Sequence, residues 1–321
     1  MIEFLNQNLQ ELFSYLLDPN KRLFIGYIVS AAVLALPVYW LMTKQKSVPG
    51  FFRFLVPKSI YLSQSAKQDY VLLVLNKLIK AALFPLVIVT MAPVALAVSS
   101  TLEWLFQTTS FFSATPMVVM ITFTILLFVF DDFTRFLLHY WLHKIPMLWE
   151  FHKVHHSAKV LTPFTIYRSH PVENYLYACR MAITQGIVVG VCYFLFGPTL
   201  KMIDILGANL FVFAFNILGS NLRHSHIWLS FGDKVEGWLI SPAQHQIHHS
   251  KHPSHYDVNL GTALAIWDRM ANNLVKASSV KSLEVGLSES QADHSSLTNI
   301  YLEPFVRCYR RIVNRLTSTS V

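Results

Sequence analysis

Apolar stretches of membrane length run through this chain and restrict what it can fold into. Of its 321 residues, 53% are hydrophobic and only 14% are charged, whereas an average soluble domain has roughly 25% charged residues. A helix that spans a bilayer needs about 20 mostly apolar residues, and Leu23–Met42 meets this requirement. Val71–Val98 is a second long stretch, in which Pro85 and Pro93 are expected to kink the helix.

Further apolar segments follow in the second half of the chain. Met117–Phe130 continues into a segment rich in histidine, and Leu176–Phe196 and Lys201–Leu218 are expected to form a hairpin that turns at Gly197 and Pro198. This hairpin either crosses the bilayer or re-enters from one side. We therefore predict an all-α, multi-pass membrane helical bundle with about four to five membrane helices or hairpins, and a histidine-rich helical cap on the cytoplasmic side.

Three histidine clusters carry the chemistry of the chain. Imidazole is the commonest protein ligand for borderline transition metals, and side chains at helix positions i, i+3 and i+4 share one face. Eight imidazoles exceed what one tetrahedral metal ion takes, so two metal ions are the natural number. The clusters read His139-Tyr-Trp-Leu-His143, His152-Lys-Val-His155-His156 and His245-Gln-Ile-His248-His249.

A single histidine belongs with the clusters. His224 follows the last apolar hairpin, at a place where its ring could reach the same depth, and it is a ninth candidate ligand. His170 and His226 are further candidates. A purely structural role for so many imidazoles is a poor explanation, because each buried ring nitrogen without a partner would cost about 1–3 kcal/mol.

The ligand type narrows the choice of metal. Sites dominated by imidazole suit iron, zinc or copper, and few carboxylates lie near the clusters. A zinc hydrolase of the HExxH kind needs a glutamate base inside the motif, and neither HxxHH cluster has one. Oxygen chemistry at iron is therefore favoured. A zinc-dependent membrane lipid hydrolase and a metal transporter or sensor are the alternatives, although a transporter would need ionisable residues inside its spans.

The charge distribution predicts the orientation. The net charge is +8, but no basic tract of the kind that follows nucleic acid phosphates is present, so we expect no nucleic acid partner. Five lysines and arginines lie between the first two spans, whereas Ser99–Pro116 contains Glu103 and no basic residue. Because cytoplasmic loops are enriched in Lys and Arg, the first loop, the histidine clusters and the C-terminus are expected on the cytoplasmic side.

The order HxxxH, HxxHH, single His, HxxHH resembles the sterol desaturase/fatty acid hydroxylase superfamily of integral membrane di-iron oxygenases. The segments His152–Glu173 and Ser241–Asp268 are similar to its bacterial branch. The resemblance implies a bacterial inner-membrane enzyme with two Fe ions, zinc being an alternative in the isolated protein. It also implies O₂ as co-substrate, hydroxylation or desaturation of a lipid C–H bond in a sterol, fatty acyl or ether lipid, and a separate electron-donor protein (cytochrome b5-like or ferredoxin/reductase).

The resemblance also assigns residues. Asp257, Asn259 and Asp268 correspond to positions that hold the ligands or stabilise the cap. One departure is Trp228, where some relatives have a histidine, so that another ligand would come from His226, His170 or water. By position, the metal ligands of the catalytic centre are His139, His143, His152, His155, His156, His224, His245, His248 and His249.

The chain divides by composition into three parts. Residues 1–21 form an N-terminal segment, and residues 22–275 form the membrane bundle and the di-metal domain, with a core at 117–275. Residues 276–321 are expected to form a polar C-terminal tail. The first segment carries acidic residues rather than a basic start, so it does not resemble a cleavable signal peptide.

Overall fold

The computed structural model describes residues 1–44, 47–87, 89–109, 112–288, 294 and 296–318. These residues are mostly helical, with 67% in helices and one short two-stranded antiparallel sheet, and the predicted all-α class is confirmed. The helices are α1 (Ile2–Ser14), α2 (Ile25–Thr43), α3 (Val48–Leu55), α4 (Lys58–Tyr61), α5 (Gln64–Val87), α6 (Met91–Phe106), α7 (Pro116–Lys144), α8 (Pro146–His156), α9 (Pro171–Phe196), α10 (Leu210–Ile217), α11 (Pro242–His248), α12 (Ile266–Met270) and α13 (Leu297–Ser318), and the strands are β1 (Asp204–Ile205) and β2 (Ala208–Asn209).

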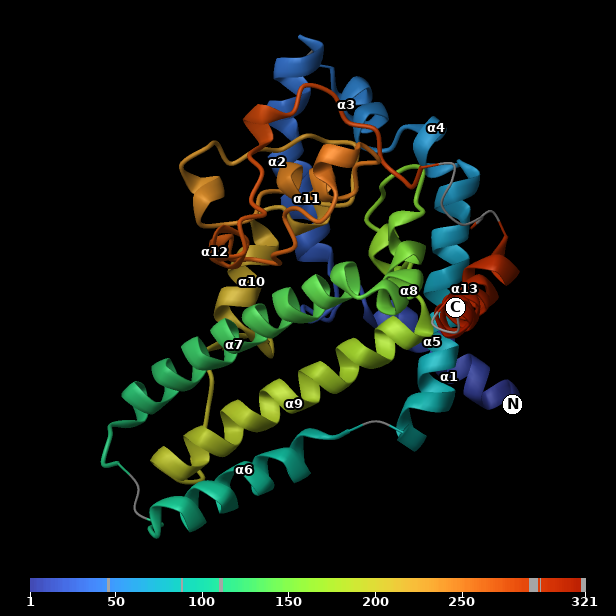
Figure 1. Cartoon of the computed structure of the whole chain (residues 1–321). Coiled ribbons are helices and arrows are strands. Elements are labelled where there is room, and N and C mark those ends of the chain that lie inside the picture. Colours follow the sequence, from blue (N-terminus) through green and yellow to red (C-terminus); the bar gives the residue numbers. More distant parts are fainter. Residues whose placement is uncertain (45–46, 88, 110–111, 289–293, 295, 319–321) are drawn as a thin grey trace.

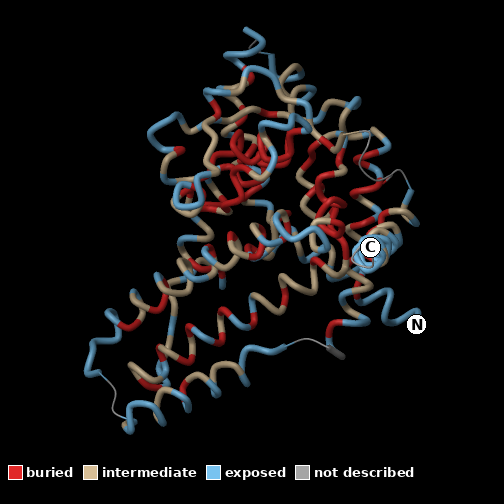
Figure 2. The backbone as a smooth tube through the Cα atoms, in the orientation of Figure 1, coloured by how far each residue is buried: buried red, intermediate tan, exposed pale blue. Residues whose placement is uncertain are grey.

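Two regions make up the molecule. Helices α6, α7 and α9 run side by side and extend away from a cap that contains α3, α8, α11 and α12 (Figure 1). Three helices in the described chain, α2, α7 and α9, are long and apolar enough to cross a membrane, and α6 is a shorter apolar helix. Buried residues concentrate in the cap, whereas many side chains of the long helices face outward (Figure 2). Apolar side chains on that outer surface suit lipid, and the protein is an integral membrane protein.

The stretch Val71–Val98 is not one kinked helix. Helix α5 ends at Val87 and α6 begins at Met91, so the helix is interrupted rather than bent between the two prolines. Pro93 lies in the first turn of α6, where its missing N–H costs no hydrogen bond. Ile88 lies outside the described residues.

The last apolar hairpin is asymmetric. Helix α9 spans 26 residues and ends at Phe196, with Gly197 as its C-cap, but its partner α10 has only 8 residues. A helix of that length rises roughly 12 Å, far less than the roughly 30 Å of a bilayer core. Between them, β1 and β2 form a tight turn at Leu206 and Gly207, both with positive φ. The second arm of the hairpin therefore does not cross a bilayer as a helix.

Small residues let α6 and α9 approach closely. A side chain at Gly186 would meet Cβ of Val94 at 2.5 Å, and one at Gly190 would meet the Ala95 carbonyl oxygen at 2.6 Å. Ala182 lies one turn earlier on the same face of α9 and is also buried. This small-xxx-small spacing is how membrane helices bring their backbones together.

Replacing Gly190 with leucine should destabilise the protein by about 1–3 kcal/mol, because the larger side chain must push α6 away from α9. The measurement is thermal unfolding of the detergent-solubilised protein. The matched control is Ile183→Leu on the outer side of α9, where the native side chain is 42% exposed. Equal unfolding temperatures for the two variants would contradict the packing role of the glycine.

Much of the predicted polar C-terminal tail is a helix, α13. Helix α13 carries a basic face and packs on α8, where Phe305 contacts Phe151 at a ring distance of 5.2 Å and Arg311 pairs with buried Glu150 at 2.8 Å. Ile300 is fully buried beside Val154. The C-terminal helix therefore supports the helix that carries the second histidine cluster.

Candidate metal centre

The structure brings all nine predicted histidines together inside the cap. They fall into two groups, and within each group the candidate ligand atoms lie within 4.8 Å of one another. Eight of the nine residues are at most 8% exposed, and the side chain of the ninth, His143, is 3% exposed. The first group is His139, His143, His152, His156 and His248, and the second group is His155, His224, His245 and His249.

The two HxxHH clusters are each shared between the groups. On α8, His152 and His156 belong to the first group, and His155, one residue before His156, belongs to the second. On α11 the division is reversed, because His245 and His249 belong to the second group and His248 to the first. Positions i and i+4 thus serve one group while i+3 serves the other, which places the two groups next to each other.

Local sequence signals place these helices. Helix α7 continues from the membrane and carries His139 and His143 one turn apart. Helices α8 and α11 each begin with a proline at the first position, where it is well tolerated. The Ser241 hydroxyl accepts from the Gln244 N–H, and the Gln244 side chain accepts from the Ser241 N–H. This full capping box fixes the start of the short helix α11.

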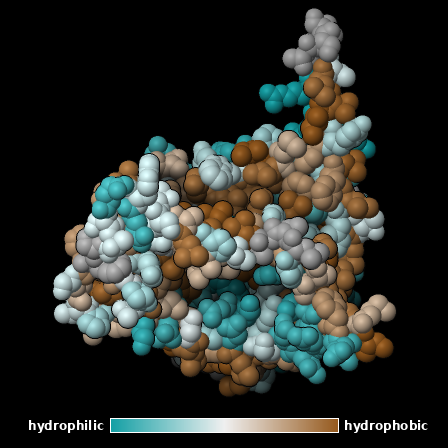
Figure 3. All heavy atoms as spheres, turned by 90° about the horizontal axis from the view of Figure 1, so that it is seen from below, coloured by the Kyte–Doolittle hydropathy of each residue, from teal (hydrophilic) through white to brown (hydrophobic). Residues whose placement is uncertain are grey.

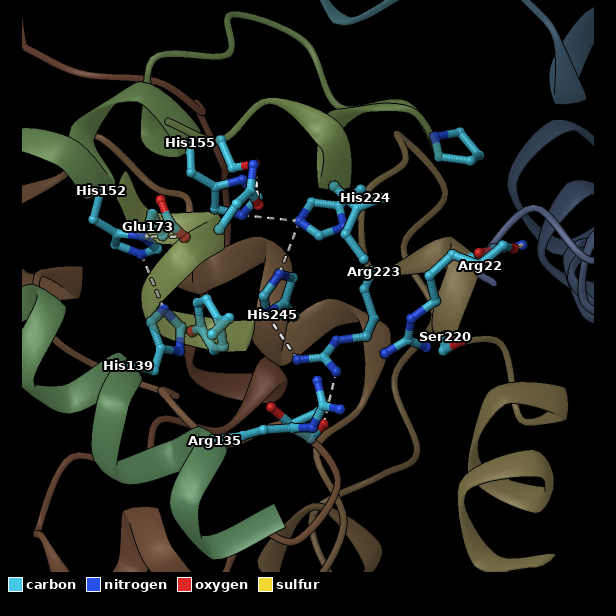
Figure 4. A pocket seen from close by; sticks show the side chains of 17 residues that line it. Arg22, Arg135, His139, His152, His155, Glu173, Ser220, Arg223, His224 and His245 are labelled. Atoms are coloured by element: carbon cyan, nitrogen blue, oxygen red, sulfur yellow. Dashed lines mark hydrogen bonds and ion pairs between the residues drawn. The ribbon is translucent and has the colours of Figure 1, made fainter. Parts of the chain in front are cut away.

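Ring nitrogens converge within both groups. In the first group, Nε2 of His139 lies 3.1 Å from Nε2 of His152. In the second, Nε2 of His224 lies 3.0, 3.2 and 3.3 Å from the Nε2 atoms of His245, His249 and His155. Figure 4 shows His155, His224 and His245 pointing toward one another.

The opposite ring nitrogens fix the orientation of the rings. Nδ1 of His139 donates to the Leu260 carbonyl at 2.7 Å, and that of His155 to the Arg168 carbonyl at 3.1 Å. Three more rings have such a partner. Nδ1 of His152 lies 3.0 Å from the Glu173 carboxylate, that of His248 lies 3.0 Å from the Val258 carbonyl, and that of His143 lies 3.2 Å from the Asp257 carboxylate. A proton held on Nδ1 leaves the Nε2 lone pair free for a metal.

The residues fit a pair of metal ions. The buried Nε2 atoms of His143, His156 and His248 have no hydrogen-bond partner, which is costly for a polar group unless a ligand is bound. Burial lowers the pKa of His156, His248 and His249 well below the usual value, and neighbouring histidines lower it further. Neutral rings with convergent lone pairs repel one another unless a cation lies between them, so the arrangement suits metal binding.

Of the three residues predicted to support the ligands, Asp257 contacts a histidine directly, and the other two hold nearby backbone. Asp257 accepts from His143 and from Lys144, which together hold the pKa of this carboxyl down to about 2. Asp268 accepts from the backbone N–H groups of Leu260 and Gly261, both at 2.7 Å. Asp268 thereby fixes the backbone at Leu260, whose carbonyl accepts the hydrogen bond from His139.

Asn259 acts on the cap rather than on a ligand. Its side chain donates to the Gln244 carbonyl at 3.0 Å and accepts from the Val275 N–H at 2.8 Å. Both Asp257 and Asn259 have positive φ, a conformation that Asp and Asn tolerate better than most residues. The two side chains therefore close the loop that follows the last cluster.

Removing the Asp257 carboxylate should weaken metal binding about 10- to 100-fold, because the partners that orient ligating histidines contribute that much. The variant is Asp257→Ala, and metal affinity is measured by competition with a chelator. Asp233→Ala is the control, since its carboxylate contacts Ser278 on the surface, away from both groups. Unchanged affinity in Asp257→Ala would rule out this role.

His170 and His226 do not join either group. The His170 ring caps α9 by accepting from the Val172 N–H, and its Nε2 donates to the Tyr301 carbonyl. His226 donates from Nε2 to the Phe54 carbonyl at 2.7 Å and packs against the Phe54 ring. The prediction that either could be a metal ligand is therefore not supported, because their ring nitrogens form hydrogen bonds with other parts of the chain.

Sequence reasoning missed three residues that shape the site. Glu173 accepts from His152 and its second oxygen is buried without a partner. Arg168 is 1% exposed, and Asp69, Ser65 and Gln68 accept from its guanidinium. Arg223 donates to Nδ1 of His245 at 2.9 Å. Of the three, only Glu173 could have been suspected from the sequence, because it is one of the few carboxylates near the histidine clusters.

Comparison with known proteins agrees with this geometry. Residues 124–273, which contain all nine histidines, match the fatty acid hydroxylase family. The chain is 30% identical over 145 residues to a Delta(7)-sterol 5(6)-desaturase of Gibberella zeae, covering 45% of this chain and 35% of the relative. This part of the chain is similar to proteins of the sterol desaturase/fatty acid hydroxylase superfamily. The predicted resemblance is thereby confirmed.

Other relatives in this superfamily have different names. An alkylglycerol monooxygenase of Danio rerio is 28% identical over 149 residues, which is 45% of this chain and 29% of the relative. A lathosterol oxidase of Rattus norvegicus is 26% identical over 172 residues, 53% of this chain and 48% of the relative. The chain thus spans about a third to a half of the length of these relatives. No solved structure gives a significant match.

Proposed function

We propose that the protein is a membrane-bound non-haem di-iron oxygenase that hydroxylates or desaturates a C–H bond of a lipid. One observation carries the proposal: nine buried imidazoles from four chain segments converge in two adjacent groups. Relatives named as desaturases, a monooxygenase and an oxidase support the redox class. We propose residues 117–275 as the catalytic core, and a sterol, fatty acyl or ether lipid as the substrate.

Two bound irons would supply the oxidation of an unactivated C–H bond with O₂ and electrons from a separate donor protein. The chain itself holds the rings in place through the Nδ1 contacts described above. Burial of the groups keeps water away from the reacting carbon. Glu173 fixes His152 and offers a second carboxylate oxygen that can hold a proton at the edge of the site.

A cavity of about 230 Å³ adjoins the histidines and is the proposed place of the reacting carbon. His139, His152 and His155 line one wall, and Ile166 and Tyr177 line part of the rest. The cavity lies where α7 and α9 meet the cap, so that a lipid could enter from the bilayer. We propose that this end of the protein is cytoplasmic, in a bacterial inner membrane, where a soluble or membrane-bound electron donor could reach it.

The test is metal content together with oxygen dependence. We expect about two irons per chain, and lipid mass spectrometry of cells with and without the gene should reveal a product with one added oxygen or one lost H₂. The same lipid converted without oxygen by a zinc-loaded protein would instead support the hydrolase. Metal bound without any lipid change, together with metal uptake into vesicles, would support a transporter.

A further inference from the structure

Three arginines line the same cavity as the histidines. Arg22 precedes α2, Arg135 lies on α7, and Arg223 precedes His224. Figure 4 shows Arg135 and Arg223 with their guanidinium groups close together, and Arg22 pointing into the same space beside Ser220. An apolar substrate alone would give no reason for a cationic wall in a site that oxidises lipid.

Carboxylates balance only part of the positive charge on this wall. Arg135 pairs with Asp131 at 2.6 Å. Arg223 is 5% exposed; it donates to the carbonyls of Thr262 and Gly261 and to His245, and its Nε is buried without a partner. The guanidinium of Arg22 donates to the side chain of Asn216. Among the described residues, neither Arg22 nor Arg223 forms an ion pair with a carboxylate.

Unpaired buried guanidinium groups are expensive, because desolvation of the charge is not offset by a counter-ion. Arg223 is almost completely buried, whereas Arg22 is partly exposed at the cavity. The acidic residue of the cavity, Glu173, contacts His152 on the histidine wall. Asp132 and Asp268 act on Arg223 from a distance, but their oxygens accept from backbone N–H groups, and neither pairs directly with Arg22 or Arg223.

A second cavity continues from the first. It measures about 280 Å³ and shares Arg135, Ile166, Ser169, Asn174 and Tyr177 with the cavity at the histidines. Four further basic residues line it, and burial together with the charges of neighbouring lysines lowers the pKa of one of them, Lys80. These residues are Lys21, Lys77, Lys80 and Arg180. Seen from below, a hollow with hydrophilic atoms opens amid hydrophobic surface (Figure 3).

We propose that the substrate carries a terminal phosphate or a carboxylate group, with no cation attached to it, which Arg22 and Arg223 bind beside the metal centre. Arginine suits this task, because its planar guanidinium forms two parallel hydrogen bonds to such groups. The small volume of the shared cavity places the reacting carbon a few bonds from the anionic group. The surrounding apolar helices favour an anionic lipid over a free anion. This inference rests on the proposed function and narrows its substrate class.

The test is a binding measurement that needs no turnover. The full-length, iron-loaded protein in phosphatidylcholine nanodiscs is titrated with dioctanoyl phosphatidic acid, dioctanoyl phosphatidylcholine or inorganic phosphate, and tryptophan fluorescence reports binding. We expect the phosphatidic acid to bind at least about tenfold more tightly than the phosphatidylcholine, since a charge-assisted hydrogen bond contributes about that factor. Inorganic phosphate should bind more weakly than phosphatidic acid, because it lacks the tails.

Three variants make the test specific. Arg22→Gln should lose the preference for phosphatidic acid, and Arg22→Lys should keep part of it because the charge remains. Arg310→Gln is the control, since Arg310 is an exposed arginine on α13 outside both cavities. Iron content and unfolding temperature show that each variant is folded and loaded.

The possible results are distinct. Equal binding of the two lipids by the wild type, or an unchanged preference in Arg22→Gln, would overturn the proposal. Inorganic phosphate that binds as tightly as phosphatidic acid would overturn the lipid part and leave a free-anion site. Selective binding without any oxygen-dependent lipid conversion would count against the proposed function and not against the anion site.

Discussion

Replacing His248 with alanine should remove most of the bound metal and lower lipid turnover by more than about a hundredfold, since the loss of a partner that only orients a ligand already costs 10- to 100-fold. The Nε2 of His248 is buried and unpartnered, and its Nδ1 is fixed by the Val258 carbonyl. The measurements are metal content by mass spectrometry of the purified protein and lipid turnover under air.

The chain offers a matched control for this variant. His226 is also a histidine of the cap, but its ring donates to the Phe54 carbonyl and lies outside both groups. His226→Ala should keep its metal and most of its activity. If His226→Ala lost metal while His248→Ala retained it, the assignment of the ligands would be wrong.

Removing Asp69 is expected to lower the free energy of unfolding by about 3–5 kcal/mol, the usual cost of leaving one partner of a buried ion pair alone. Asp69 is fully buried, and Arg168 donates to it at 2.6 Å while Thr165 donates to its other oxygen at 2.7 Å. The Asp69→Ala variant would leave the Arg168 guanidinium buried without a carboxylate. Denaturant unfolding in detergent measures the change.

A surface ion pair provides the comparison for Asp69. Glu303 pairs with Arg307 one turn along α13, and both side chains are partly exposed. Glu303→Ala should cost less than about 0.5 kcal/mol, as expected for such helical pairs. Similar losses in the two variants would contradict the structural role of the buried pair. Because the Arg168 carbonyl accepts a hydrogen bond from His155, we also expect Asp69→Ala to lose metal more readily.

The histidines could be predicted from the sequence because their spacing already contains the geometry. Residues four apart on a helix share a face, so His152 with His156 and His245 with His249 are local facts. The division of each cluster between two groups could not be predicted, because it depends on how α8 and α11 face each other. The partners on Nδ1 were hidden for a related reason, since three of them are backbone carbonyls, which every residue carries.

The fold was predictable to a similar depth. Hydrophobicity identified the stretches of α2, α7 and α9 as membrane helices, because composition and length decide that question. It did not reveal the break between Val87 and Met91 or the short α10. Those features depend on what each segment packs against, and the contact of Gly186 and Gly190 with α6 joins residues about 90 positions apart.

The division of each histidine cluster between the two groups has a consequence for how the two proposed ions would bind. Helix α8 supplies both groups, and so does the segment His245–His249, so the two groups depend on the same two chain segments. Capture of the first ion would order the scaffold that the second one needs. Chelation should therefore convert the population directly from doubly loaded to empty, with hardly any chain holding a single ion.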